Sequence, residues 1–547
     1  MYGKLGIVVE DNGVLGIRAT FKKRYITLAP VAGVVGLAFN LKDPNKLLNG
    51  VGSEGITIAL LEKGHPGLRI GNRHDPLMAA FMNGTVEGED VFISMNHLLG
   101  GQPRAGFGWN MLMDCLAEGR GISLPALSMS AAKGISSTVG AYARIRKQFK
   151  VAIADMEGVQ EALARSGGNT YIMQSAQALT NAMLNKHEQP AVISAIMKQQ
   201  MTARMRMTVN DGMDILGGAG ICNGKANFLA NAYANVPIAI TVEGANILTR
   251  SLIQFGQGLT RSHPHLLHMI QAIQKGDDIK GFQSALFATV SHGLSNTARS
   301  LSYAVTRKRS KGGDLVGYYE SQLAKLSANF ALSSDFALTM GGKVKSAEFT
   351  SGRFADVLSN LFLGYATLWY YSKYPVQGAD KVVEYALDNI LFETEEAFFS
   401  IFNNFPVPGL GPVMKGLTFP FGRVYQRPGD KSIRAVSNAI TLDSAVREQF
   451  EQDLFISQTP GDRVGLIIAT LPKVIAADKI RVSCRKEKRQ PTSAEELLLK
   501  EADAATEEII QVDSFARLGI ENTYEPAWTA SSRPAYGAKV MVGARSG

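Results

Sequence analysis

The carboxylate of Glu243 stands out, in the run from Thr241 to Arg250 (TVEGANILTR), as a group that could act as a general base. It follows the apolar run PIAI and is flanked by Val242 and Gly244, so we expect poorly hydrated surroundings. Desolvation disfavours the charged form and raises a carboxyl pKa, which makes the group a stronger base. Gly244 lacks a side chain and lets backbone and substrate approach closely. The pattern therefore predicts a proton acceptor at position 243.

The local pattern leaves a second interpretation of Glu243 open. A helix is expected to start near Glu243 and run toward Gly258. A carboxylate in the first turn of a helix interacts favourably with the helix macrodipole. On position alone, Glu243 could be such a structural carboxylate.

The elements that must position this residue fall into four predicted parts. Residues 1–101 contain short β-branched and apolar runs separated by Gly, Pro and Asn, which predict a β-rich domain. In residues 102–275, apolar residues recur at spacings of three and four, which predicts a bundle of long helices. Residues 276–530 are expected to be helical, and residues 531–547 to form a flexible tail. The predicted fold class is α+β, mainly α.

Several of these elements are predicted with bounds. Helices are expected over Met111–Leu116, Pro125–Phe149, Glu157–Asn185 and from Pro190 to Leu216, where the GGAG run stops the last one. The almost continuously apolar segment Ile56–Leu61 is expected to be a strand covered on both faces.

Composition and charge exclude several classes of function. The net charge of +9 comes from dispersed basic residues, with clusters only at Arg307–Lys311 and Arg481–Arg489. These clusters lack interleaved aromatic residues, so no nucleic-acid partner is expected. The three cysteines lie far apart and lack metal-ligand spacing, which predicts no metal site and a reducing, cytoplasmic compartment. The longest apolar run, Ile26–Phe39, is shorter than the roughly 20 residues of a spanning helix.

Four motifs, in chain order, carry a resemblance to a known family. They are KRYIT at Lys23–Thr27, YARIRKQFK at Tyr142–Lys150, DGMDILGGAG at Asp211–Gly220 and ITVEGANILTR at Ile240–Arg250. They resemble the K-x-W-I-T, Y-A-x-x-R-x-x-F-G, D-A-x-Q-x-x-G-G-x-G and I-Y-E-G-T-x-x-I-x-R segments of acyl-CoA dehydrogenases. The chain is most similar to the long bacterial members of fatty-acid β-oxidation, which carry a helical C-terminal extension.

The resemblance implies FAD as cofactor and a role for each matching residue. Tyr25, in place of the usual Trp, and Thr27 are expected beside the flavin ring. The residues expected to reach the flavin dinucleotide bound to a neighbouring subunit are Arg146, Phe149, Asp214, Gly217 and Gly218. Glu243 is implied to be the catalytic base, with Gly244 and Arg120 at the substrate.

Several of these assignments have alternatives. Some family members place the base on an earlier helix, where Glu118 lies one residue out of register. Arg120 could equally form an ordinary ion pair, and Arg146 could be a helix-end cation. Gly217 and Gly218 could also form a helix C-cap turn, and Asp214 replaces the family's usual Gln.

The resemblance also implies the reaction and its partners. Members of the family oxidise an acyl-CoA to the trans-2-enoyl-CoA: a carboxylate takes the α proton and the β carbon loses a hydride to flavin N5. For this chain we expect medium or long acyl chains, an electron-transfer flavoprotein as acceptor, and a homodimer or homotetramer. A cytoplasmic location is expected, with peripheral contact to the inner membrane left open.

The family's helical N-terminal domain and its T-E-P-x-A-G-S-D segment have no counterpart in this sequence. The resemblance therefore implies a truncated, partly barrel-like middle β domain at the start of the chain, followed by the four-helix bundle. We expect this chain to bind FAD poorly. Two other functions stay open: a non-catalytic helical interaction protein that keeps the fold without flavin, and a flavoenzyme that oxygenates substrates or oxidises nitroalkanes. Retention of Glu in VEGAN favours the dehydrogenase.

Overall fold

The N-terminal part of the chain forms one six-stranded sheet. The computed structural model describes residues 5–77, 79–188, 191–251, 279–307 and 310–515. The strands are β1 (Leu5–Asp11), β2 (Val14–Thr27), β3 (Val34–Lys42), β4 (Gly55–Glu62), β5 (Leu68–Arg73) and β6 (Asn83–Ser94). Their order is β4-β3-β1-β2-β6-β5, with β1 and β3 parallel and the other neighbours antiparallel. Alternate residues of the strands other than β5 are buried and form a core of their own.

The Ile56–Leu61 prediction is wrong in one respect. The segment is a strand, β4, but only one of its two faces is buried. Buried and exposed residues alternate along it, and Leu60 is 44% exposed. Burial alternates with a period of two in a strand that has one face in solvent. The alternation appears here although the residues on the exposed face are apolar.

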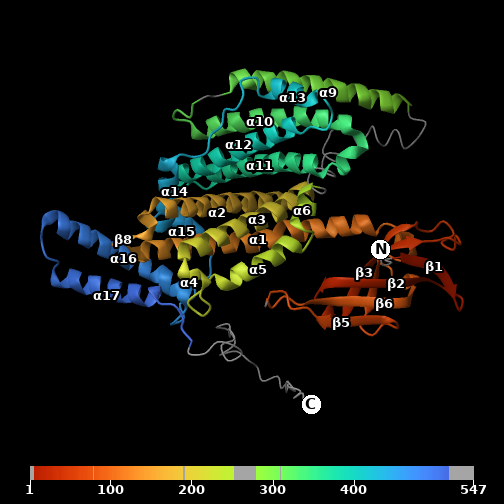
Figure 1. Ribbon diagram of the computed structural model, residues 1–547. Helices are drawn as coiled ribbons and strands as arrows, with labels where there is room; N and C mark the ends of the chain where they lie inside the picture. The colour runs from red at the N-terminus through yellow and green to blue at the C-terminus, as the bar shows by residue number, and fades with distance from the viewer. Residues whose placement is uncertain (1–4, 78, 189–190, 252–278, 308–309, 516–547) are drawn as a thin grey trace, which may run out of the picture.

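A bundle of long helices follows the sheet, as predicted. It consists of α1 (Gly108–Ile145), α2 (Glu157–Leu184), α3 (Ala191–Leu216) and α5 (Ala230–Thr241). The helices α1, α2 and α3 lie side by side, and α5 packs on α3 (Figure 1). The helix α5 was not predicted, because Pro237 lies inside it.

The helix α1 corrects two of the predicted bounds. It is one continuous helix through Pro125, where two separate helices, Met111–Leu116 and Pro125–Phe149, were expected. Proline removes one backbone hydrogen bond, but α1 packs against α2 and α3, and tertiary packing overrides local propensity. The helix ends at Ile145, because the chain then forms a small hairpin of β7 (Lys147–Gln148) and β8 (Val151–Ala152).

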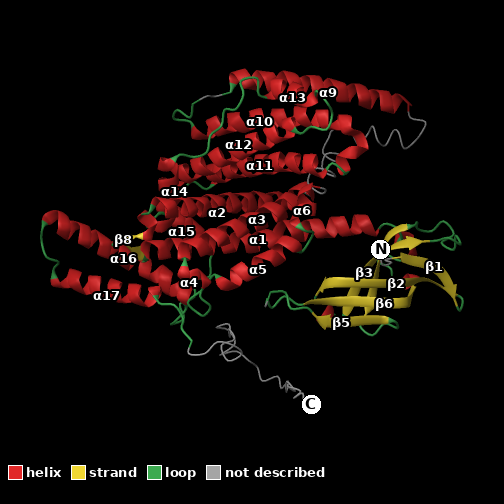
Figure 2. Ribbon diagram, viewed as in Figure 1, coloured by secondary structure: helices red, strands yellow, loops and turns green. Residues whose placement is uncertain are grey.

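The described residues of the C-terminal part form helices joined by loops, as Figure 2 shows. Its helices are α9 (Ile279–Thr306), α10 (Leu315–Ala337), α11 (Glu348–Lys373), α12 (Ala379–Asn403), α13 (Leu410–Thr418), α14 (Asp430–Thr441), α15 (Ala445–Glu451), α16 (Arg463–Glu487) and α17 (Ser493–Ile510). Helices α11, α12 and α14 pack on α2, so bundle and extension share one hydrophobic core. The mainly helical α+β fold class is confirmed.

Two findings on membranes and metals apply to the described ranges only. None of the helices there combines the length and the apolar character needed to cross a bilayer. Nor do three or more His, Cys, Asp or Glu side chains in those ranges converge as a metal site would require. The predicted tail, residues 531–547, lies outside the described residues.

Candidate functional site

Glu243 lies in a tight turn between α5 and α6 (Asn246–Leu248), so the helix expected to start near Glu243 begins at Asn246 and continues as a π-helical turn over residues 249–251. The stretch from residue 252 to Gly258 is outside the described residues. Glu243 has a φ of +56° and Gly244 a φ of +93°. The left-handed region is unfavourable for a residue with a Cβ and is common only for glycine. The surrounding structure must therefore hold Glu243 in this conformation.

The expectation that Glu243 is poorly hydrated is wrong for this chain. Its side chain is exposed, and Gly244 is half-buried. The apolar flanking residues do not cover the carboxylate, because the turn after Thr241 directs the chain away from α5. The macrodipole interpretation also loses its basis, since Glu243 precedes α6 and does not lie in its first turn.

Two buried cations lie near this carboxylate. Arg120, on α1, is 6% exposed, and its Nε has no hydrogen-bond partner among the residues that the structure describes. Burial lowers the pKa of Arg120, and the charge of Glu243 opposes that effect. The structure thus brings together Glu243, Gly244 and Arg120. The side chain of the alternative base, Glu118, lies outside the described part of the structure.

The second cation, Lys198 on α3, was not among the predicted site residues. Its side chain is completely buried. Its Nζ donates to the backbone oxygen of Gly244 at 2.7 Å and to Oδ1 of Asn246 at 2.8 Å. One signal was present in the sequence, because Lys198 interrupts a helical face that includes the buried residues Met197 and Met201.

The predicted flavin-ring residues lie at the end of β2. Tyr25 and Thr27 are exposed, and Tyr25 has a φ of +58°. The pairing of β2 with β6 shifts register between Lys23 and Ile26, and such an irregularity re-aims side chains. The Tyr25 ring contacts the ring of His74, with centroids 5.4 Å apart. The sheet therefore presents an aromatic and a hydroxyl side chain at the C-terminal end of β2.

A cavity separates this end of the sheet from the bundle. It has a volume of about 460 Å³ and is lined by Leu77 from the loop after β5, by Arg206 and Asn210 from α3, and by Tyr233, Ala234, Val236 and Pro237 from α5. The loop also contains His74, whose ring contacts Tyr25. Its lining joins α3 to α5, the helix that leads into the Glu243 turn.

The predicted adenosine contacts lie at the other end of α3. Asp214, Gly217 and Gly218 are exposed, and a Cβ on either glycine would meet no atom within 4 Å. Gly217 has a φ of +56° and ends the helix, so the C-cap interpretation is correct. An open glycine turn also permits close approach of a ligand to the backbone.

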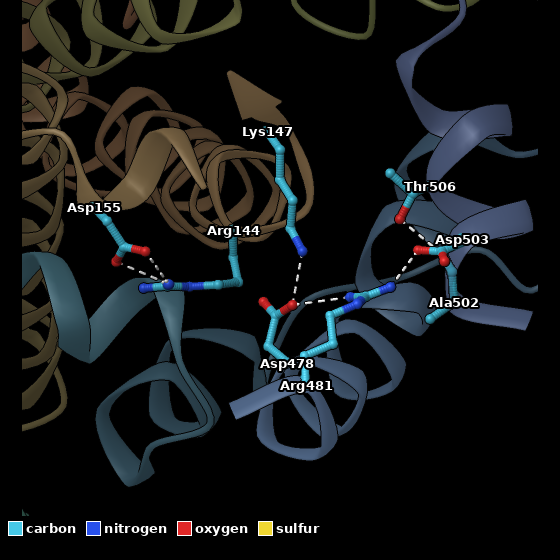
Figure 3. A network of polar contacts seen from close by, with 8 residues as sticks. All are labelled: Arg144, Lys147, Asp155, Asp478, Arg481, Ala502, Asp503 and Thr506. Atoms are coloured by element: carbon cyan, nitrogen blue, oxygen red, sulfur yellow. Dashed lines mark hydrogen bonds and ion pairs between the residues drawn. The ribbon is translucent and has the colours of Figure 1, made fainter. Parts of the chain in front are cut away.

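The predicted residues Arg146 and Phe149 belong to the β7–β8 hairpin. Arg146 directly follows α1, and Phe149 is 91% exposed at the tip. Lys147, beside Arg146, donates to Asp478 of α16 at 2.7 Å, and Asp478 also accepts from Arg481 (Figure 3). The C-terminal extension therefore binds the hairpin through the ion pair of Lys147 with Asp478.

The structure does not bring all predicted residues to one place. Arg120 lies within the first half of α1 and Arg146 directly follows the helix, so the two are about 39 Å apart at the rise of an α-helix. The hairpin and the Glu243 turn therefore cannot contact the same small group within one chain. The resemblance had placed Arg146 and Phe149 at a neighbouring subunit's cofactor, which agrees with this separation.

Family models match most of the helical chain. One described as "Acyl-CoA dehydrogenase, C-terminal domain" matches residues 106–256, and another described as "Acyl-CoA dehydrogenase, C-terminal, bacterial type" matches residues 260–519. The fold is similar to that of an acyl-CoA dehydrogenase from Bacillus anthracis, solved as a complex with FAD, with a TM-score of 0.62 and 16% identity. That similarity covers 80% of this chain and 72% of the other.

Two relatives match by sequence over shorter segments. Protein HemX of Proteus mirabilis is 44% identical over 104 residues, which are 19% of this chain and 61% of the relative. A probable short/branched chain specific acyl-CoA dehydrogenase of Dictyostelium discoideum is 32% identical over 154 residues, or 28% of this chain and 34% of the relative. The chain thus spans less than two thirds of each relative. Because two acyl-CoA dehydrogenase models match consecutive parts of the chain and the fold agrees, the chain belongs to the acyl-CoA dehydrogenase family.

Proposed function

We propose that the protein is a FAD-dependent acyl-CoA dehydrogenase that converts medium- or long-chain acyl-CoA to trans-2-enoyl-CoA in fatty-acid β-oxidation. The observation that carries the proposal is the Glu243 turn: an exposed carboxylate in a left-handed conformation beside two buried cations. Bound FAD supplies the acceptor, at N5, for the hydride that leaves the β carbon.

The chain's own residues have distinct tasks in this proposal. Glu243 takes the α proton, and its exposure leaves the carboxylate free to meet a substrate. Gly244, half-buried and without a side chain, lets the thioester approach the backbone. Arg120 supplies a buried positive charge near the carboxylate.

Residues at two places fit a flavin dinucleotide. Tyr25 and Thr27 offer an exposed ring and a hydroxyl at the end of β2, which suit the flavin ring. The open turn at Gly217 and Gly218 suits the adenosine part, bound from a second subunit together with the Phe149 hairpin. We therefore propose a homodimer or homotetramer that passes electrons to an electron-transfer flavoprotein in the cytoplasm.

The test is anaerobic reduction of the FAD-loaded protein by a series of acyl-CoA substrates of different chain length. We expect bleaching of the flavin absorbance by the wild type. In Glu243→Gln the rate constant for bleaching should fall by at least about 100-fold, which is the low end of general-base contributions. The matched control is Glu501→Gln, an exposed glutamate on α17, which should reduce at the wild-type rate.

Two results would contradict the proposal. Near-normal reduction of Glu243→Gln would remove the assignment of the base. Wild-type protein that holds FAD and is reduced by none of the acyl-CoAs would favour the alternative of a non-catalytic interaction protein.

A further inference from the structure

A buried ammonium group lies directly beneath the turn that presents Glu243. The Lys198 side chain is 0% exposed, although lysine is among the residues most often found at the surface. Removing a charge from water is costly unless hydrogen bonds replace the lost hydration. The acceptors around Lys198 therefore show what compensates for its burial.

Three acceptors surround Nζ of Lys198, and all belong to the Glu243 segment. They are the backbone oxygens of Ile240 at 3.1 Å and Gly244 at 2.7 Å, and Oδ1 of Asn246 at 2.8 Å. A protonated lysine has three N–H donors, so each can be matched to one acceptor. The ammonium group thus joins the end of α5, the turn and the start of α6.

The Ile240 contact has an additional electrostatic reason. Ile240 lies in the last turn of α5, where helix carbonyls have no intrahelical partner. The negative end of the helix macrodipole lies there, and a cation is favourable. Asn246 is held from the same helix as Lys198, because its Nδ2 donates to Oγ1 of Thr202 at 2.9 Å.

The conformation of the turn requires such restraints. Glu243 has a φ of +56°, which a residue with a Cβ adopts only when its surroundings hold it there. The side chain of Glu243 is exposed, so it takes no part in packing that could do so. The restraint comes from the backbone on both sides, where Lys198 binds Ile240 and Gly244 and where Oγ1 of Thr249 donates to Gly244 at 3.2 Å.

The charges of the cluster are also coupled. Burial lowers the pKa of Lys198 to about 8, the charge of Glu243 acts in the opposite direction, and Arg120 lowers it further. An ionised Glu243 therefore favours the charged form of Lys198, the form that can fill all three acceptors.

We propose that Lys198 is a positioning residue, which holds the Ile240–Asn246 turn in the conformation that presents the Glu243 carboxylate. Its consequence for catalysis rests on the function proposed above. Its consequence for the turn rests on the hydrogen bonds alone and can be measured without catalysis.

The first measurement is hydrogen exchange in peptides that cover residues 238–251. The amides of Val242 and Thr249 donate to Ile238 and Ala245, each at 2.9 Å, and report whether the turn is intact. In Lys198→Met we expect their exchange to accelerate on the order of tenfold or more, because hydrogen bonds to a charged group are lost. Asn246→Ala, which removes one acceptor without removing the cation, should give a smaller change at the same amides.

The matched control is Lys325→Met. Lys325 lies on α10, is 2% exposed and has a pKa lowered to about 8, so the substitution is equivalent in burial and charge. It should leave exchange in residues 238–251 unchanged. In the FAD-loaded protein, Lys198→Met should lower kcat on the order of tenfold or more with little change in KM, and Lys325→Met should alter neither.

The outcomes separate this inference from the proposed function. Unchanged exchange at Val242 and Thr249 in Lys198→Met and Asn246→Ala contradicts the positioning role. An equal acceleration throughout α1, α2 and α3 contradicts it as well. Faster exchange confined to the turn supports that role even if the wild type oxidises no acyl-CoA, a result that would reject only the proposed function. Local loosening with unchanged kcat in an active enzyme would overturn the catalytic consequence.

Discussion

Buried lysines in this chain differ in what surrounds the ammonium group. Lys198 meets three oxygen acceptors, whereas Nζ of Lys325 lies 4.7 Å from the ring centre of Phe419 and 5.8 Å from that of Tyr425. Cation–π contact replaces hydration less completely than matched acceptors do. The pKa of Lys325 is lowered to about 8 by burial and by Arg307, and the charge of Glu395 opposes this. Protonation of Lys325 is therefore coupled to folding.

At this residue scale we predict a pH dependence of stability. The pKa of Lys325 is about 8 in the folded chain and 10.5 in the unfolded chain. Between these two pH values, the unfolded chain therefore binds a proton that the folded chain releases. Stability should therefore rise with pH over this interval, by at most about 3 kcal/mol. Urea titrations should show this rise in the wild type and a smaller one in Lys325→Met. Lys500→Met, on the exposed face of α17, should follow the wild type, and parallel curves for all three proteins would contradict the prediction.

At the scale of elements, glycines set how closely helices approach. A Cβ at Gly140 of α1 would lie 2.3 Å from the backbone oxygen of Ile440 in α14. A Cβ at Gly167 of α2 would lie 3.0 Å from Val436 of the same helix. Helix α14 thus lies against glycines of two bundle helices. The Ile440 oxygen is a backbone atom, which cannot move aside as a flexible side chain can.

Gly140→Ala should therefore destabilise the fold, although alanine favours helices. The clash with the Ile440 carbonyl should cost about 1–3 kcal/mol, as overpacking does. Gly134→Ala, on the same helix with no atom within 4 Å of the added carbon, should stabilise by about 0.5–1 kcal/mol. Thermal melts of the two variants should shift in opposite directions. A shift of the same sign in both would show that α1 and α14 adjust to the added methyl group.

At the scale of the whole molecule, α2 connects the two family-matched segments. Nearly every residue from Gln160 to Gln177 is buried. Helices α1 and α3 cover part of its surface, and α11, α12 and α14 cover the rest. A helix buried on all sides lacks the single apolar stripe of a surface helix. The extension therefore completes the core of the bundle.

Removal of the chain from residue 260 onward should consequently destabilise the bundle. It would expose the faces of α2 that α11, α12 and α14 cover, including Tyr171 and Leu163, both 0% exposed in the complete chain. Exposed apolar area of this kind promotes aggregation. Light scattering and calorimetry should show aggregation and loss of the cooperative unfolding transition. A soluble, cooperatively folding fragment of residues 1–259 would contradict a shared core.

The sequence by itself determined the features that depend on neighbouring residues. Helix bounds came close where periodicity and caps are local: Glu157–Asn185 was predicted and α2 is Glu157–Leu184, and α3 ends at Leu216 before Gly217, as expected. The family and the mainly helical fold followed from motifs that lie in order along the chain. The role of Glu243 and the flavin contacts stay predictions.

Only the tertiary structure decided the features that depend on distant contacts. Pro125 lies inside a continuous α1 because packing along the helix outweighs its local preference. Glu243 is exposed, although its neighbours are apolar, because the turn after α5 directs it outward. Lys198 meets carbonyl groups more than 40 positions away, a contact that no local pattern encodes. Periodicity and capping act over a few residues, whereas these environments form only when separate helices pack together.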